Sequence, residues 1–223
     1  MNIADPTLSP DAGLAPIGPA WLASLVSSRI CHDLISPVGA VCNGVELIEE
    51  FGAAGDQEMA LIGDSARSAA AQLQLFRTAF GAGAHEAEYS LDQLRKVLDG
   101  RFAAERAGIA WRLEPGRTTT RLGARLCALG TLGAAAALPR GGDITLSEPA
   151  PHTLQVAASG PMLRIDPDAP LWTAGKPGGR APEPRDVHWL AARAFAQEGG
   201  AALALTSDEA ALTFTIALPE PKG

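Results

Sequence analysis

Two successive segments with apolar residues at helical spacing constrain this chain most. The first runs from Pro19 to Phe51, and its apolar residues recur at intervals of three and four: Leu22, Val26, Ile30, Leu34, Val38, Val41, Val45 and Ile48. The second begins near Asp56 and shows the same intervals at Met59, Ile62, Ala66, Ala69, Leu73, Phe76 and Phe80. This period is that of one face of an α-helix. The pattern predicts two helices, with ends marked by Gly52 and Gly55 and by Gly81 and Gly83.

Two helices joined by a short loop form an antiparallel hairpin. A hairpin on its own leaves much of both apolar stripes exposed, whereas two copies packed as a four-helix bundle bury them. We therefore expect a homodimerisation domain over residues 19–83. Residues 1–18 contain several prolines and glycines and are expected to be disordered or extended.

Beyond residue 86 the signals for helices and strands alternate. Helices are predicted at 91–107, 122–138 and 187–197, and strands at 143–146, 154–158 and 211–218. The segment from Pro167 to Pro184 is rich in proline and glycine and is predicted to be a loop. The fold class is therefore α+β, with a helical hairpin followed by an α/β sandwich over residues 86–223.

Composition argues against several classes of protein. The formal net charge is −7, and no cluster of lysine and arginine stands out, so a direct nucleic-acid ligand is not expected. No apolar run approaches the roughly 20 residues of a membrane-spanning helix. The cysteines Cys31, Cys42 and Cys127 lack the short paired spacing of a zinc site or a disulfide framework. We expect a cytoplasmic protein without a bound metal.

His32 is the residue with the clearest chemical potential. At about 100° per residue it projects opposite the apolar stripe of the first segment, so its ring is expected to face solvent. Asp33 follows it, and Pro37 lies five residues later, where it removes a backbone donor and predicts a loosened turn. An exposed histidine beside an acid fits a chemical role better than a packing role.

The stretch Ser28-Arg29-Ile30-Cys31-His32-Asp33-Leu34-Ile35-Ser36-Pro37 resembles the phosphoacceptor box of dimeric sensor histidine kinases. The continuation from Val38 to Glu50, and the run from Ser65 to Gly81, are similar to the ChpT family of alphaproteobacterial histidine phosphotransferases. This resemblance implies a dimeric four-helix bundle that carries His32. It also implies a second domain similar to the ATP-binding (Bergerat-type) domain of histidine kinases.

The second domain departs from the kinase pattern at three places that bind nucleotide. The paired asparagines would lie in residues 129–134, where the sequence has none. The aspartate of the Asp-x-Gly motif would lie near Ala158, and the glycine-rich lid near residues 186–189, which include His188 and Trp189. Bulky side chains there hinder close backbone approach to phosphates. We expect a degenerate domain that binds no ATP and no other cofactor.

The resemblance implies that His32 takes a phosphoryl group from the receiver domain of a hybrid histidine kinase and passes it to response regulators. Asp33 would orient the imidazole, and any magnesium would be held by the receiver. The residues expected to contact the receiver share the outward side of the first helix: Ser28, Arg29, Ile35, Ser36, Gly39 and Asn43.

Alternatives remain open at this point. Asp33 and Arg29 could be ordinary solvated charges, Gly39 a tolerated glycine, and Ile35 one of the scattered apolar residues found on most surfaces. The chain could also be a fragment of an ATP-dependent sensor kinase or a non-catalytic adaptor that binds receivers. A phosphatase action through Ser36 and Asp33 is compatible with the transferase.

Overall fold

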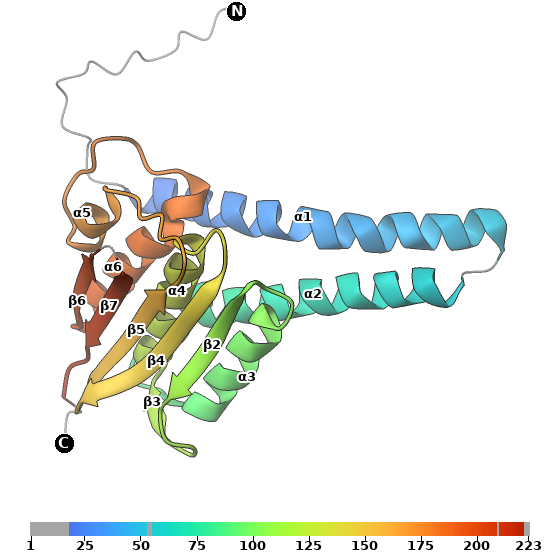
Figure 1. Cartoon of the computed structure of the whole chain (residues 1–223). Helices are drawn as coiled ribbons and strands as arrows, with labels where there is room; N and C mark the ends of the chain where they lie inside the picture. Colours follow the sequence, from blue (N-terminus) through green and yellow to red (C-terminus); the bar gives the residue numbers. More distant parts are fainter. Residues whose placement is uncertain (1–17, 53–54, 209, 221–223) are drawn as a thin grey trace, which may run out of the picture.

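The computed structural model describes residues 18–52, 55–208 and 210–220. Two long antiparallel helices, α1 (Pro19–Phe51) and α2 (Asp56–Phe80), project from an α/β body, as Figure 1 shows. This confirms the predicted hairpin. Gly52 ends α1 in the left-handed conformation and donates its amide to the carbonyl of Ile48. The expected disorder of residues 1–18 falls, apart from Gly18, outside the described residues.

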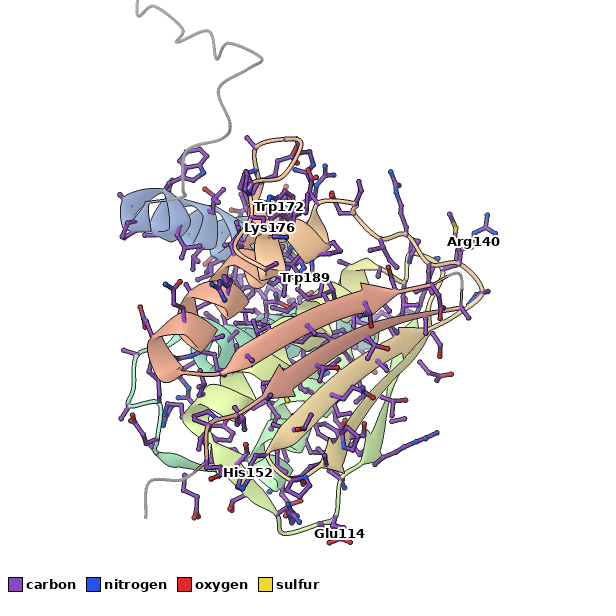
Figure 2. The ribbon with its side chains drawn as sticks, turned by 90° about the vertical axis from the view of Figure 1, so that its left-hand side faces the viewer. Glu114, Arg140, His152, Trp172, Lys176 and Trp189 are labelled. Atoms are coloured by element: carbon purple, nitrogen blue, oxygen red, sulfur yellow. The ribbon has the colours of Figure 1, made fainter. Side chains whose placement is uncertain are left out.

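The body is a two-layer sandwich of helices on one face of a sheet. Five strands form the main sheet in the order β2-β4-β5-β7-β6, in which β2 runs parallel to β4 and the other neighbours are antiparallel. The helices lie on one face of this sheet, and Figure 2 shows the other face open. The strands are β2 (Ala107–Arg112), β4 (Gly142–Ala150), β5 (Thr153–Ser159), β6 (Ala202–Ser207) and β7 (Ala211–Ala217), and the helices are α3 (Leu91–Phe102), α4 (Arg121–Ala136), α5 (Ala169–Thr173), η1 (Pro184–Asp186) and α6 (Val187–Gly199). A separate pair, β1 (Glu88–Ser90) and β3 (Thr118–Thr120), is antiparallel.

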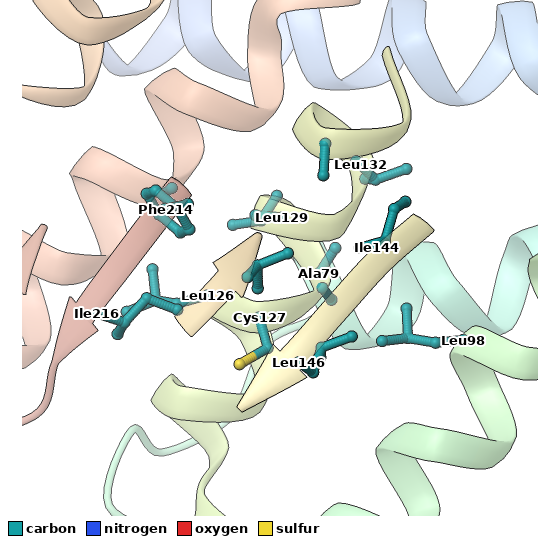
Figure 3. Close-up of a cluster of buried hydrophobic side chains, with 14 of the residues drawn as sticks. Ala79, Leu98, Leu126, Cys127, Leu129, Leu132, Ile144, Leu146, Phe214 and Ile216 are labelled. Carbon is teal, nitrogen blue, oxygen red and sulfur yellow. The ribbon is translucent and has the colours of Figure 1, made fainter. Parts of the chain in front are cut away.

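The core lies between α4 and the covered face of the sheet (Figure 3). Alternate residues of β4, β5 and β7 point into it, as the period of two in a strand requires. Leu25 of α1 and Leu75 and Ala79 of α2 belong to the same buried cluster. The base of the hairpin is therefore packed into the sandwich. The division into domains at 19–83 and 86–223 stays a prediction.

The helix predicted at 91–107 is too long. It ends at Phe102, and a turn leads to β2, which starts at Ala107. The prediction ran through the turn after Phe102 and one residue into β2, whose residues Ala107, Ile109 and Trp111 lie on the covered side. Short strands give a weak periodic signal, so β1, β2, β3 and β6 were not predicted.

The segment 167–184 is not entirely a loop, because it contains the short helix α5. Pro170 stands in the first turn of α5, where a proline removes no needed hydrogen bond. Trp172 is buried and anchors this turn. Composition alone therefore gave the wrong prediction for these five residues.

His188 is buried at the start of α6, next to Trp189 and α4. A Cβ on Gly133 of α4 would overlap the indole of Trp189, so the glycine lets the two helices meet closely. Burial, and to a smaller extent the nearby Arg29 cation, lowers the pKa of His188 to about 3. The ring is therefore neutral in the folded chain at physiological pH.

This burial predicts an acid-sensitive fold. Between pH 6.5 and about 3 the unfolded chain binds a proton on His188 that the folded chain does not, so the free energy of unfolding falls as pH falls through this window. Within this window, His188 alone lowers the free energy of unfolding by about 1.4 kcal/mol for each unit by which the pH falls. Urea unfolding at a series of pH values measures the slope. The variant His188→Phe keeps an aromatic ring and should show a shallower slope than the parent; equal slopes would contradict the assignment.

Candidate functional site

His32 lies on the outer side of α1, where the sequence pattern places it. The side chain is 84% exposed, because the apolar residues of α1 turn the opposite side of the helix inward. The expectation that the ring faces solvent is confirmed. An incoming group can reach this imidazole without any movement of the chain.

Asp33 fixes one edge of the ring. Its Oδ1 lies 3.1 Å from Nδ1 of His32. A carboxylate accepts hydrogen bonds, so this contact favours the tautomer with a proton on Nδ1. Nε2 then carries the lone pair on an otherwise exposed ring. The pair thus has the arrangement of a nucleophile with an orienting acid.

The carboxylate of Asp33 is itself held from two helices. Its other oxygen, Oδ2, accepts from Nε of Arg29 at 2.7 Å and from Nε2 of Gln72 at 3.1 Å. The Asp33 side chain is only 15% exposed, so it lies along the hairpin seam, the line on which α1 packs against α2. The seam is narrow: a Cβ on Gly44 would overlap the side chain of Ile62. The exposed imidazole of His32 is therefore hydrogen-bonded to an acid that is itself half-buried and held in place.

Gln72 was not among the residues singled out in the sequence. It stands at helical spacing with Leu75, Phe76 and Ala79, all of them buried, and its own side chain is 4% exposed. A buried amide is costly unless it is hydrogen-bonded. A polar residue in an apolar register was the signal that could have found it.

Arg29 connects this site to the C-terminal body. Its Nη1 lies 3.4 Å from the carbonyl oxygen of Arg185 in η1, and its cation lies close enough to His188 to depress the pKa of that ring. Arg29 also lines a cavity of about 440 Å³ together with Arg101 and Arg106. Glu105 lines the same cavity and bonds Arg101 at 2.5 Å, so this flank of the site carries three guanidinium groups and one carboxylate.

The residues expected to contact a partner all lie on α1, and we call them the outer strip. Most are exposed, and Ile35 is 73% exposed although it is apolar. Gly39 is half-buried, with open space where a Cβ would stand. Arg29 differs from the rest, because it is 20% exposed and bonded within the chain. The outer strip surrounds His32 on the same face of α1: Ser28, Arg29, Ile35, Ser36, Gly39 and Asn43.

Pro37 stands inside α1, and the helix continues through it. Because proline has no amide hydrogen, it cannot donate to the carbonyl of Asp33. The loosened turn predicted from the sequence is thus limited to one missing backbone hydrogen bond, and α1 is continuous on both sides of it.

The segments that the sequence analysis compared with the kinase pattern lie in or beside the core. Residues 129–134 of α4 are all buried, and Ala158 at the end of β5 is fully buried. Trp172 and Trp189 lie in the part of the body next to the start of α1 (Figure 2).

The segment before α6 is tied down by Arg180. Its guanidinium bonds Asp166 at 2.5 Å and Asp186 at 2.8 Å, and lies 4.9 Å from the ring centre of Trp172. These contacts connect the segment to α5 and η1, and the hydrogen bonds to Asp186 and Asp166 raise the pKa of Arg180.

Within 18–52, 55–208 and 210–220, no group of three or more His, Cys, Asp or Glu side chains has an arrangement suitable for a metal ion. None of the helices in this described part is long and apolar enough to cross a membrane.

Known proteins resemble the chain over most of its length. Residues 91–211 match the family described as histidine phosphotransferase C-terminal domain. The protein phosphotransferase ChpT of Brucella abortus (strain 2308) is 36% identical over 175 residues, which cover 75% of this chain and 79% of that protein.

Solved structures are similar as well. One described as a bacterial phosphotransferase superposes with a TM-score of 0.74 and 30% identity, over 89% of this chain and 97% of that chain. The histidine kinase AdeS of Acinetobacter baumannii gives a TM-score of 0.47 and 12% identity, over 86% of this chain and 98% of that chain. Because the family match spans over half of the chain and the Brucella protein is 36% identical, the chain belongs to the histidine phosphotransferase family.

Proposed function

We propose that this protein is a histidine phosphotransferase of a multistep phosphorelay and that His32 carries the phosphoryl group. It would take the group from a phosphoaspartate of a hybrid kinase's receiver domain and pass it to the aspartate of response regulators. The observation that carries this proposal is the 84% exposed imidazole of His32, bonded through Nδ1 to a half-buried acid.

The chemistry requires little beyond position. Nε2 of His32 attacks the phosphorus, the bond between phosphorus and the receiver's carboxylate oxygen breaks, and the carboxylate leaves with the electron pair. The proton on Nδ1 stays between the ring and Asp33, whose negative charge stabilises the positive charge that develops on the ring. Transfer to the next receiver is the reverse of these steps with a different carboxylate.

No cofactor of this chain takes part in the proposed reaction. Phosphoryl transfer needs cations that neutralise the phosphoryl oxygens. We assign a magnesium ion to the receiver's own carboxylates, and the Arg29 side of the site adds positive charge nearby.

The receiver is proposed to dock on the outer strip. Apart from Arg29, its residues are uncharged and most are short, which allows a partner's backbone to come close to His32, and Ile35 offers an exposed apolar contact. Open space over Gly39 continues this surface along α1.

We also propose that the protein is a homodimer through a four-helix bundle. Residues at intervals of seven remain exposed on the hairpin: Val38 and Val45 on α1, and Met59, Ala66 and Leu73 on α2. Four of these five are large apolar side chains that are 43–52% exposed. Spacing of seven is typical of helices that pack along their length. A second hairpin would cover this exposed stripe and leave the outer strip free.

The rival activity is ATP-dependent autophosphorylation. Nucleotide binding would need space and polar groups beside α4, whereas residues 129–134 are buried and Trp189 lies against Gly133. The Arg180 network also closes the segment that would cover phosphates. These contacts support a role for the C-terminal body as a scaffold.

Replacement of the phosphoacceptor tests the main proposal. In a relay reconstituted from a phosphorylated receiver, the full chain and an acceptor response regulator, His32→Ala should reduce transfer to background because the nucleophile is lost. Phosphate gels detect the phosphorylated species. His152→Asn, at an exposed histidine far from α1, is the matched control and should transfer normally. Undiminished transfer by His32→Ala would favour an adaptor that only brings receivers together.

Incubation with labelled ATP and magnesium tests the kinase alternative. Without any receiver, His32 should remain unlabelled, because the nucleotide positions are filled. The same preparation should accept phosphoryl from a phosphorylated receiver, which shows that it is active. Label on His32 from ATP alone would overturn the proposed exclusion of kinase activity.

Oligomeric state tests the bundle. The chain should elute as a dimer in size-exclusion chromatography with light scattering, and Val45→Glu with Leu73→Glu should give a monomer, because charges would be buried at the interface. Leu61→Glu is the control: Leu61 is 62% exposed and lies on the side of α2 away from Met59. A monomeric parent protein at micromolar concentration would contradict the bundle.

A further inference from the structure

The Asp33 carboxylate has more partners than an exposed acid beside a histidine would need. Both oxygens are used: Oδ1 faces Nδ1 of His32, and Oδ2 accepts from Arg29 and Gln72. The donors come from both helices of the hairpin, one turn back along α1 and across the seam on α2. With Oδ2 engaged twice, rotation of the carboxylate is restricted, and Oδ1 stays directed at the ring.

We propose that Arg29 and Gln72 are positioning residues that hold the Asp33 carboxylate with one oxygen on Nδ1 of His32, and so keep Nε2 as the reactive nitrogen. This inference rests on the proposed phosphotransfer through His32. Neither residue touches the reacting atoms; both act through Asp33.

Burial supports this role for Gln72. Its side chain is 4% exposed in a register shared with Leu75 and Ala79, where an apolar residue would pack without cost. The hydrogen bond to Asp33 is the one contact recorded for its amide donor among the described residues. This buried amide therefore has the Asp33 carboxylate as its partner, and it can hold that carboxylate in one orientation.

Arg29, on α1, adds a second constraint, because it also contacts the C-terminal body. Its Nε faces Asp33 while Nη1 reaches the Arg185 carbonyl oxygen in η1. A guanidinium can hold two acceptors at once because its donors lie in one rigid plane. The orientation of Asp33 is thereby linked to the seating of the C-terminal body against α1. This contact also makes Arg29 a structural part of the site and leaves less of it for a docking partner.

Loss of either donor should free the carboxylate to rotate. The proton of a neutral imidazole then distributes between Nδ1 and Nε2, because the tautomer is set by the hydrogen bond that the ring makes. Molecules with the proton on Nε2 cannot attack through that nitrogen. A small misplacement of a reacting group costs up to 100-fold in rate, so we expect a loss of about tenfold for each single variant.

The test uses the full chain with Gln72→Met and Arg29→Met. Two readouts are taken: the rate of phosphoryl transfer from a receiver domain charged with acetyl phosphate, and the His32 tautomer from ¹⁵N chemical shifts of the ring. The variants should slow transfer about tenfold, and each should move the tautomer from Nδ1–H toward Nε2–H. Arg29→Lys keeps the charge without the planar fork and should restore the rate only in part.

Matched controls come from the same hairpin. Gln74→Met and Arg67→Met remove an exposed amide and an exposed guanidinium of α2, neither of which contacts Asp33. Both should leave the rate and the tautomer unchanged. Circular dichroism of every variant reports whether the hairpin is intact.

A background of Asp33→Asn separates positioning from general damage. If Arg29 and Gln72 act through the carboxylate, their replacement should add little once the carboxylate is gone. An unchanged tautomer in both Met variants, or the same tenfold loss in the Asp33→Asn background, would overturn the inference. A parent protein that shows the Nδ1–H tautomer but takes no phosphoryl from the receiver would instead refute the proposed function.

Discussion

The packing of the hairpin base into the sandwich core is the contact on which the rest of the molecule depends. Leu25, Leu75 and Ala79 are buried with residues of α4 and the sheet in one cluster. This contact fixes where α1 lies on the body, and therefore where His32 lies relative to η1 and α6. The distal part of the hairpin then extends beyond the body (Figure 1), whereas Arg29 of the outer strip lies beside η1.

The site combines exposure and restraint in adjacent residues. His32 is open to solvent, while Asp33, next in the chain, is half-buried and bonded on both oxygens. Helical geometry makes this possible, because consecutive residues point about 100° apart. One side chain can thus serve a visiting partner while its neighbour remains tied to the fold, and the reactive ring needs no enclosed pocket of its own.

Much of the hairpin could be predicted from the sequence, whereas the body could be predicted only in outline. Long stripes with a regular period identify α1 and α2 and place His32 outside, since many residues contribute to one signal. Strands such as β2 and β6 are only six residues long, so their signal is weak. Of the two donors to Asp33, Arg29 stands one helical turn earlier, a spacing that the sequence shows. Gln72 lies 39 positions away, and only its polar side chain in an apolar register hints at it. The contact of Arg29 with Arg185 runs through a backbone carbonyl, which carries no residue-specific signal.

The close contact between Gly133 and Trp189 has a consequence for how this body can change. Any side chain at position 133 would overlap the indole, so a polar group cannot be introduced there by one substitution alone. Trp189 would first have to be replaced by a smaller residue. That replacement opens a void beside His188 and Phe214 and costs several kcal/mol of stability. Gly133 and Trp189 are therefore coupled positions: a change at one is tolerated only with a compensating change at the other, so this contact between α4 and α6 restricts how the body can vary.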